Sequence, residues 1–174
     1  MRLFKASIIG LSGLFIFITL LSLLIPSKIM VTKAVAIHAD AGKVFTQISD
    51  LQNWKNWQPV FKRDSANIVF GKDSTGNVSS IEWESKGKKN KFVITSKKDN
   101  AITASLLREG ESEVLNTITI LPVAEQNQVQ VEWNALIKLK WYPWEKFYGI
   151  FIEKVTGQGY EDALNSLKAY VEAH

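Results

Sequence analysis

The amino-acid sequence predicts an α+β protein in which a curved antiparallel sheet wraps around a long C-terminal helix, with one apolar helix before it. An uncharged apolar stretch fills Ile8–Ile25. Six runs with strand-like alternation, joined by short turns, follow between about residues 68 and 140, and consecutive strands with short connections pair antiparallel. A broad apolar stripe at helical spacing then covers residues 143–172.

The composition is that of one folded domain plus an apolar leader. The chain has 174 residues, 46% of them hydrophobic and 22% charged, which is too apolar for a disordered chain. It has no cysteine, which excludes disulfide scaffolds, thiol nucleophiles and cysteine–zinc sites. Because His38 and His174 are the only histidines, we expect no metal site, and we expect no cofactor.

The formal net charge of +4 is concentrated near the N-terminus. Arg2, Lys5 and Lys28 give the first thirty residues +3, and the rest of the chain has 18 basic and 17 acidic side chains, a net +1. A domain with a net charge so close to zero lacks the positive field that drives binding to phosphate backbones. We therefore expect no nucleic-acid partner. One local basic run suits either a solvated hairpin tip or attraction to anionic lipid headgroups: Lys86, Lys88, Lys89 and Lys91.

The apolar leader is predicted to be a transmembrane anchor. Ile8–Ile25 contains 18 uncharged residues, and as a helix it would span roughly 27 Å, close to the ~30 Å of a bilayer core. Arg2 and Lys5 precede it, and Pro26 closes it. We therefore expect two parts, an anchor with short flanks at residues 1–30 and a folded domain at residues 31–174.

A cleaved secretory signal and a buried core helix are the alternatives to an anchor. Signal cores usually span about 7–15 apolar residues, and the nearest A-x-A pattern, Ala34–Ala36, lies within the first predicted strand. The rest of the chain offers little to cover an apolar helix on all sides. We expect an uncleaved single-pass protein with its domain on the periplasmic or extracellular side, because Arg2, Lys5 and the amino terminus favour the cytoplasm.

One strand and two helices are predicted after the anchor. Val31–Ile37 alternates loosely in the manner of a strand. Asp40 is a suitable N-cap for the first helix. Asp50 can cap a second, short helix around Trp54–Trp57, which Pro59 ends.

Strands dominate the middle of the chain. In the second of them Ile81 and Trp83 share one face, while Glu82 and Glu84 share the other. The last has the clearest alternation. The predicted strands are Ile68–Phe70, Val78–Ser85, Phe92–Lys97, Ala101–Arg108, Val114–Leu121 and Gln128–Lys140.

The C-terminal pattern predicts one long helix. Pro143 suits its first position. Gly157 and Gly159 interrupt the apolar stripe, where they would permit a bend or a close approach to the sheet. Because one helix cannot fill the whole concave face of a curved sheet, we expect a cavity between them.

Several segments occur in an order that resembles a known family. They are residues 45–54 with Trp57 and Pro59, Ile81–Trp83, Val129–Trp133 and Gly157–Lys168. Together they resemble the START-like, or SRPBCC, superfamily over residues 31–172, in particular its polyketide cyclase/dehydrase group. The resemblance implies a helix-grip fold with a deep, mostly apolar pocket for lipids, polyketides or other hydrophobic molecules. The superfamily includes enzymes, transfer proteins and receptors, so the fold alone selects no activity.

We expect such a pocket to be lined from the strands and the C-terminal helix. Tryptophan combines a large apolar ring with a polar N–H, which suits a core or an amphipathic cavity. Arg108 and Asn116 suit a polar end of the pocket or a plain strand surface. Trp141, Tyr142 and Trp144 would also suit a membrane surface, where aromatic rings are favoured. The expected lining residues are Trp57, Trp83, Arg108, Asn116, Trp133, Tyr148, Phe151 and Val155.

No catalytic residue is predicted. His38 beside a helix start is conceivable as a general base, but no nucleophile accompanies it. Glu82 and Glu84 have the spacing of an acid–base pair, although their alternation with apolar residues favours a solvated face.

The sequence therefore favours a membrane-tethered module that binds a hydrophobic small molecule or lipid in this cavity. The second hypothesis is an enzyme such as a polyketide cyclase acting on an apolar substrate, which needs an ionisable residue with a perturbed pKa inside the cavity. The third is a protein-interaction domain whose cavity is filled by its own side chains.

Overall fold

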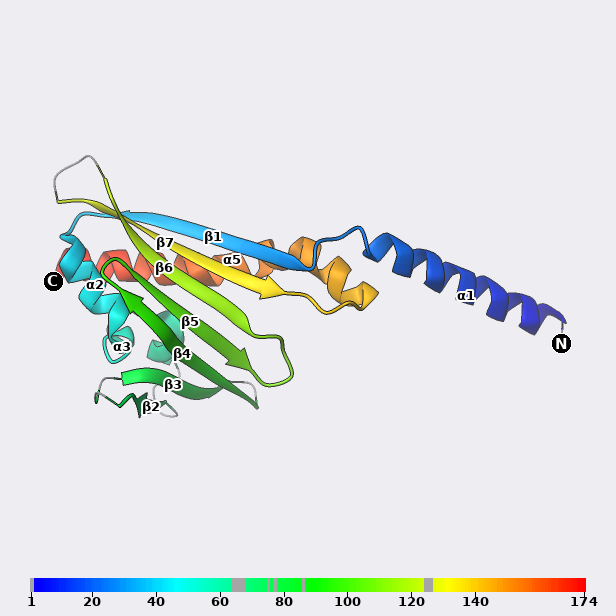
Figure 1. The fold of residues 1–174 in the computed structure, drawn as a ribbon, viewed down its shortest axis with the longest axis horizontal. Helices are drawn as coiled ribbons and strands as arrows, with labels where there is room; N and C mark the ends of the chain where they lie inside the picture. The colour runs from blue at the N-terminus through cyan, green and yellow to red at the C-terminus, as the bar shows by residue number, and fades with distance from the viewer. Residues whose placement is uncertain (1, 64–67, 75, 77, 86, 124–126) are drawn as a thin grey trace.

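A seven-stranded antiparallel sheet forms the body of the molecule, and a long helix, α5 (Pro143–Ala173), packs along one of its faces (Figure 1). The computed structural model describes residues 2–63, 68–74, 76, 78–85, 87–123 and 127–174. The predicted α+β class, the sheet gripping a C-terminal helix and the apolar N-terminal helix are confirmed.

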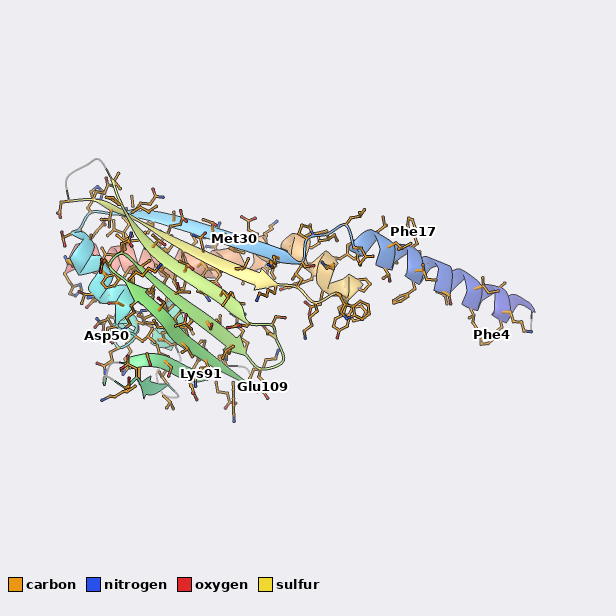
Figure 2. All side chains as sticks on the ribbon, viewed as in Figure 1. Phe4, Phe17, Met30, Asp50, Lys91 and Glu109 are labelled. Atoms are coloured by element: carbon orange, nitrogen blue, oxygen red, sulfur yellow. The ribbon has the colours of Figure 1, made fainter. Side chains whose placement is uncertain are left out.

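Helix α1 (Arg2–Ser22) projects away from the sheet, and Phe4 and Phe17 point into open space (Figures 1 and 2). It ends three residues before the predicted Ile25. Pro26 disfavours a helical conformation in the residue before it, and the backbone closes with tight i→i−3 hydrogen bonds from the N–H groups of residues 23–25.

Strand β1 (Lys28–Ile37) starts three residues earlier than predicted. Its ten residues all pair with β7 (Val129–Lys138), from Lys28 opposite Lys138 to Ile37 opposite Val129. Strand β1 therefore includes residues 28–30, which we had grouped with the anchor.

Three short helices follow where two were predicted, namely α2 (Ala41–Ser49), α3 (Trp54–Trp57) and α4 (Pro59–Arg63). The Asp40 carboxylate caps α2 by accepting a hydrogen bond from the Gly42 N–H at 2.8 Å. The expectation that Pro59 only ends a helix was incomplete, because it also begins α4. Proline is well suited to a first helical position, where its missing N–H is not needed.

The other strands form a meander, and β1 joins it beside β7. The spatial order is β1-β7-β6-β5-β4-β3-β2, with every neighbouring pair antiparallel. In the predicted basic run of Lys86, Lys88, Lys89 and Lys91, the first residue lies outside the described residues. Gly87, between β3 and β4, has φ 71°. The strands are β2 (Val69–Lys72), β3 (Val78–Ser85), β4 (Lys88–Lys98), β5 (Ala101–Arg108) and β6 (Val114–Pro122).

Helix α5 closes the core without a break at its glycines. Gly157 faces β1, where an added Cβ would lie 3.0 Å from Lys33 Cε, and Gly149 lies even closer to Leu139 and Ile29. These two glycines let the helix backbone approach the sheet. Gly159 faces open space instead, so of the two predicted glycines only Gly157 serves close packing.

Candidate functional site

A cavity of about 250 Å³ lies between the sheet, α3, α4 and the middle of α5. Its wall is mainly aromatic, with aliphatic contributions from β5, α4 and α5. The aromatic residues that line it are Trp54, Phe61, Trp83, Phe92, Trp133 and Tyr160.

Ring contacts hold this aromatic wall together. The Trp54 ring centroid lies 4.9 Å from that of Phe92 and 5.7 Å from that of Trp133, which in turn lies 5.2 Å from Tyr160. The indole N–H of Trp54 donates to the Ile48 carbonyl at 3.1 Å. Such mutually packed rings form a rigid apolar surface, because each is oriented by its neighbours.

Asn116 is a buried polar residue of the cavity wall. Its side-chain oxygen accepts a hydrogen bond from Trp133 Nε1 at 3.0 Å, and its amide nitrogen donates to the Val114 carbonyl at 3.0 Å. Since buried polar groups must be paired, Asn116 orients the Trp133 ring toward the cavity from the neighbouring strand.

Arg108 and Tyr160 are the ionisable residues among those that line this cavity in the described part of the chain. Burial raises the pKa of the Tyr160 hydroxyl, and the nearby positive charge of Arg108 only partly offsets that effect. Tyr160 is therefore a neutral hydroxyl at physiological pH, able to donate a hydrogen bond. The Arg108 guanidinium also lies 3.4 Å from the Glu111 carboxylate.

A second cavity of about 220 Å³ adjoins the first toward the start of α5. The two share Arg108, Thr156 and Tyr160, so these side chains mark the boundary between them. Tyr148 lines the second cavity only.

The structure brings five of the eight expected lining residues to the main cavity. Trp57 is not among the lining residues. It is fully buried, its ring centroid lies 4.9 Å from that of Trp54, and its indole nitrogen donates to the Gln47 carbonyl. Phe151 lies on the exposed side of α5. The five that line the main cavity are Trp83, Arg108, Asn116, Trp133 and Val155.

Sequence reasoning missed several lining residues for which signals existed. Leu106 precedes Arg108 by two positions, so both lie on the same face of β5. Tyr160 belongs to the apolar stripe of α5. Trp54 is three residues before Trp57, and only packing decides which of the two rings reaches the cavity.

The other candidate residues lie away from the cavity. The side chain of His38 is mostly exposed and lies 3.2 Å from the Glu172 carboxylate. Glu82 and Glu84 are exposed on the outer face of the sheet. The Glu82 carboxylate forms an ion pair with Lys91 Nζ at 2.8 Å. Within the described residues no cluster of three or more potential metal ligands occurs.

The sheet, the gripped helix and the cavity together define a START-like helix-grip protein. The chain belongs to the family described as "Polyketide cyclase / dehydrase and lipid transport", whose model matches residues 28–172. No curated protein sequence matches it.

Solved structures with the same fold come from bacteria and a plant. A START superfamily protein from Mycobacterium smegmatis is 18% identical with a TM-score of 0.63, covering 83% of this chain and 97% of its own. The Zhui aromatase/cyclase from Streptomyces sp. R1128 is 13% identical with a TM-score of 0.59, covering 83% and 94%. Norcoclaurine synthase from Thalictrum flavum is 12% identical with a TM-score of 0.61, covering 84% and 96%. At these identities the similarity establishes the fold.

Proposed function

We propose that this protein is a membrane-tethered module that binds a hydrophobic small molecule or lipid in the cavity between the sheet and α5. The observation that carries the proposal is the aromatic wall around about 250 Å³ of space. Apolar pockets with a few polar groups are the usual form of small-molecule sites. The family's description, which includes lipid transport, agrees with this chemistry.

The size of the cavity limits the ligand. Ligand pockets usually measure roughly 300–1,000 Å³, so about 250 Å³ is small. It suits one ring system or a short acyl segment better than a whole two-chain lipid. Arg108 and Tyr160, at the boundary with the second cavity, would face a polar or anionic group on such a ligand.

Binding is favoured over catalysis by the residues of the cavity wall. General acid–base chemistry near neutral pH needs a group whose pKa lies near that pH. Tyr160 has its pKa moved further away from neutrality, and the guanidinium group of Arg108 offers no acceptor for a proton. The described residues that line the main cavity include no carboxylate or histidine, and the carboxylates of Glu111 and Glu145 line the adjoining cavity instead. The open cavity also argues against an interaction domain filled by its own side chains.

The tether is proposed from α1. Phe4–Ser22 is long and apolar enough to cross a bilayer, and the side chains from Phe4 to Phe17 are exposed. A signal sequence has the same features. Cleavage after Ala36, however, would remove nearly all of β1, whose residues pair with β7 from end to end. We therefore propose an uncleaved anchor, with the domain at residues 28–174 on the periplasmic or extracellular side.

Native mass spectrometry of the detergent-extracted full chain tests the binding function. We expect a co-purified hydrophobic molecule that is lost in Leu106→Trp, because Leu106 lines the cavity and the larger indole would occupy it. Leu107→Trp is the matched control, since Leu107 is exposed on the opposite face of the same strand. Repeated isolation of empty wild-type protein, or an equal loss in both variants, would contradict the proposal.

A further inference from the structure

Large aromatic side chains are exposed at the start of α5. Trp141 and Trp144 are 67% and 64% exposed. The Tyr142 ring lies between them, stacked on Trp144 with 5.0 Å between centroids and 5.0 Å from Trp141. We call Trp141, Tyr142 and Trp144 the aromatic cluster. Two neighbouring indoles left in water are unusual for a soluble surface, and exposed apolar patches commonly mark interaction sites.

An exposed apolar stripe continues from the aromatic cluster along α5. Trp144, Tyr148, Phe151 and Val155 recur at intervals of four, three and four residues, which places them on one side of the helix, and all four are more than half exposed. Val155 also lines the main cavity. At about 1.5 Å per residue, the stripe leads from the cluster to the cavity over roughly 16 Å.

Lys146 ties this part of α5 to the end of the anchor. Its side chain is buried, and its Nζ donates to the Ile25 carbonyl at 2.9 Å and to Ser27 Oγ at 2.6 Å. Figure 1 shows the start of α5 at the end of the domain from which α1 projects. The aromatic cluster therefore lies beside the point where the chain leaves the apolar helix.

The same end of the domain is basic. Lys28 and Lys138 are exposed and directly opposite each other in the β1–β7 register, and Lys140 is exposed two residues further on. Like charges in opposing positions repel, so a nearby negative surface would relieve them. Anionic lipid headgroups supply such a surface, and tryptophan and tyrosine favour the same headgroup layer.

We propose that the aromatic cluster and the first turns of α5 lie in the headgroup layer of the bilayer that holds α1. The inference rests on the anchor in the proposed function. It adds that the domain itself contacts the membrane surface, through the aromatic cluster and the first turns of α5. We call this contact the seat of the domain. The exposed stripe of α5 then offers an apolar ligand a continuous surface from the bilayer to the cavity.

Single-cysteine spin labels on the full chain in vesicles of phosphatidylcholine and phosphatidylglycerol test this seat. The chain has no native cysteine, so each label reports one position. Trp144→Cys and Phe151→Cys probe the seat, Leu14→Cys probes the anchor, and Lys43→Cys is the aqueous control, being exposed on α2 at the opposite end of the domain. For each label we compare the rate of collision with oxygen with the rate of collision with a water-soluble nickel complex. We expect the ratio of these two rates to be several-fold higher for labels 144 and 151 than for label 43.

The outcomes separate the seat from the anchor. If labels 144 and 151 match label 43 while label 14 reports the bilayer core, the seat is refuted and the anchor stands. If label 14 is also aqueous, both are refuted. Quenching of the native tryptophans by brominated lipids gives a second reading without labels. It should fall sharply in Trp141→Tyr/Trp144→Tyr, and unchanged quenching in that variant would overturn the seat.

Discussion

The close approach of α5 to the sheet predicts different effects on stability for two alanine substitutions on the same helix. A Cβ added at Gly149 would lie 2.3 Å from Leu139 Cδ1 and 2.8 Å from Ile29 Cδ1, whereas at Gly159 it would meet no atom within 4 Å. To reach an ordinary contact of 3.4 Å, the Leu139 methyl group would have to move by about 1.1 Å. Leu139 is buried, so little room is available for that movement.

The expected magnitudes follow from two effects. Replacing glycine by alanine inside a helix gains about 1 kcal/mol in helix propensity, and both variants receive that gain. Overpacking a tight contact costs about 1–3 kcal/mol, and only Gly149→Ala incurs it. We therefore expect Gly159→Ala to raise the free energy of unfolding by about 1 kcal/mol, and Gly149→Ala to fall about 1–3 kcal/mol below Gly159→Ala.

Urea unfolding in detergent, followed by tryptophan fluorescence, measures this difference. All six tryptophans lie in the part of the chain after α1, so the fluorescence signal reports that part alone. The comparison is valid if the dependence of stability on urea concentration is the same for both variants. Equal unfolding midpoints for the two variants would show that α5 does not approach Leu139 and Ile29 this closely.

Three further predictions concern the cavity wall, the pH dependence of stability and the N-terminal helix. Trp133→Phe should destabilise the domain by about 1–3 kcal/mol in urea unfolding, because the buried Asn116 oxygen loses its donor; a cost as large in the Asn116→Leu background would contradict that cause. The backbone N–H of His38 donates to the Glu172 carboxylate and is the main reason that its pKa is lowered. Glu172 should therefore stabilise the fold at pH values above the ordinary glutamate pKa of about 4.3, and this contribution should be lost as the pH falls through the lower pKa that Glu172 has in the folded state. The difference in free energy of unfolding between wild type and Glu172→Gln should consequently vanish in acid. A difference that does not depend on pH would refute this linkage. Removal of residues 1–27 should leave a soluble, folded domain. Its circular dichroism spectrum should equal that of the full chain after the helical signal of α1 is subtracted, and insolubility would mean that the apolar helix belongs to the core.

The regular elements were largely predictable because their signals are local. Alternation placed Val78–Ser85 and Ala101–Arg108 at their observed bounds, and Pro143 was correctly expected to begin the last helix. The start of β1 was less predictable. Residues 28–30 alternate no better than many loops, and they become a strand because β7 offers them partners more than a hundred residues away.

The cavity lining was predictable only in part, since it depends on which neighbours a side chain meets. Trp54 and Trp57 have the same local pattern, yet only Trp54 reaches the cavity, where it packs against Phe92 and Trp133. No local pattern distinguishes Lys146 from the other lysines of the last helix. Its burial against the Ile25 carbonyl depends on where α1 ends relative to α5, which no local pattern encodes.

Periodicity, proline positions and an unbroken apolar run were thus enough to predict most of the helices and strands and a helix of bilayer length, because each acts over a few neighbouring residues. The family was indicated separately, by segments whose order along the chain resembles that of its members. The position of the cavity, the residues that open into it and the link between α5 and the segment after α1 required the folded chain. They depend on how side chains from strands and helices far apart in the sequence pack against one another.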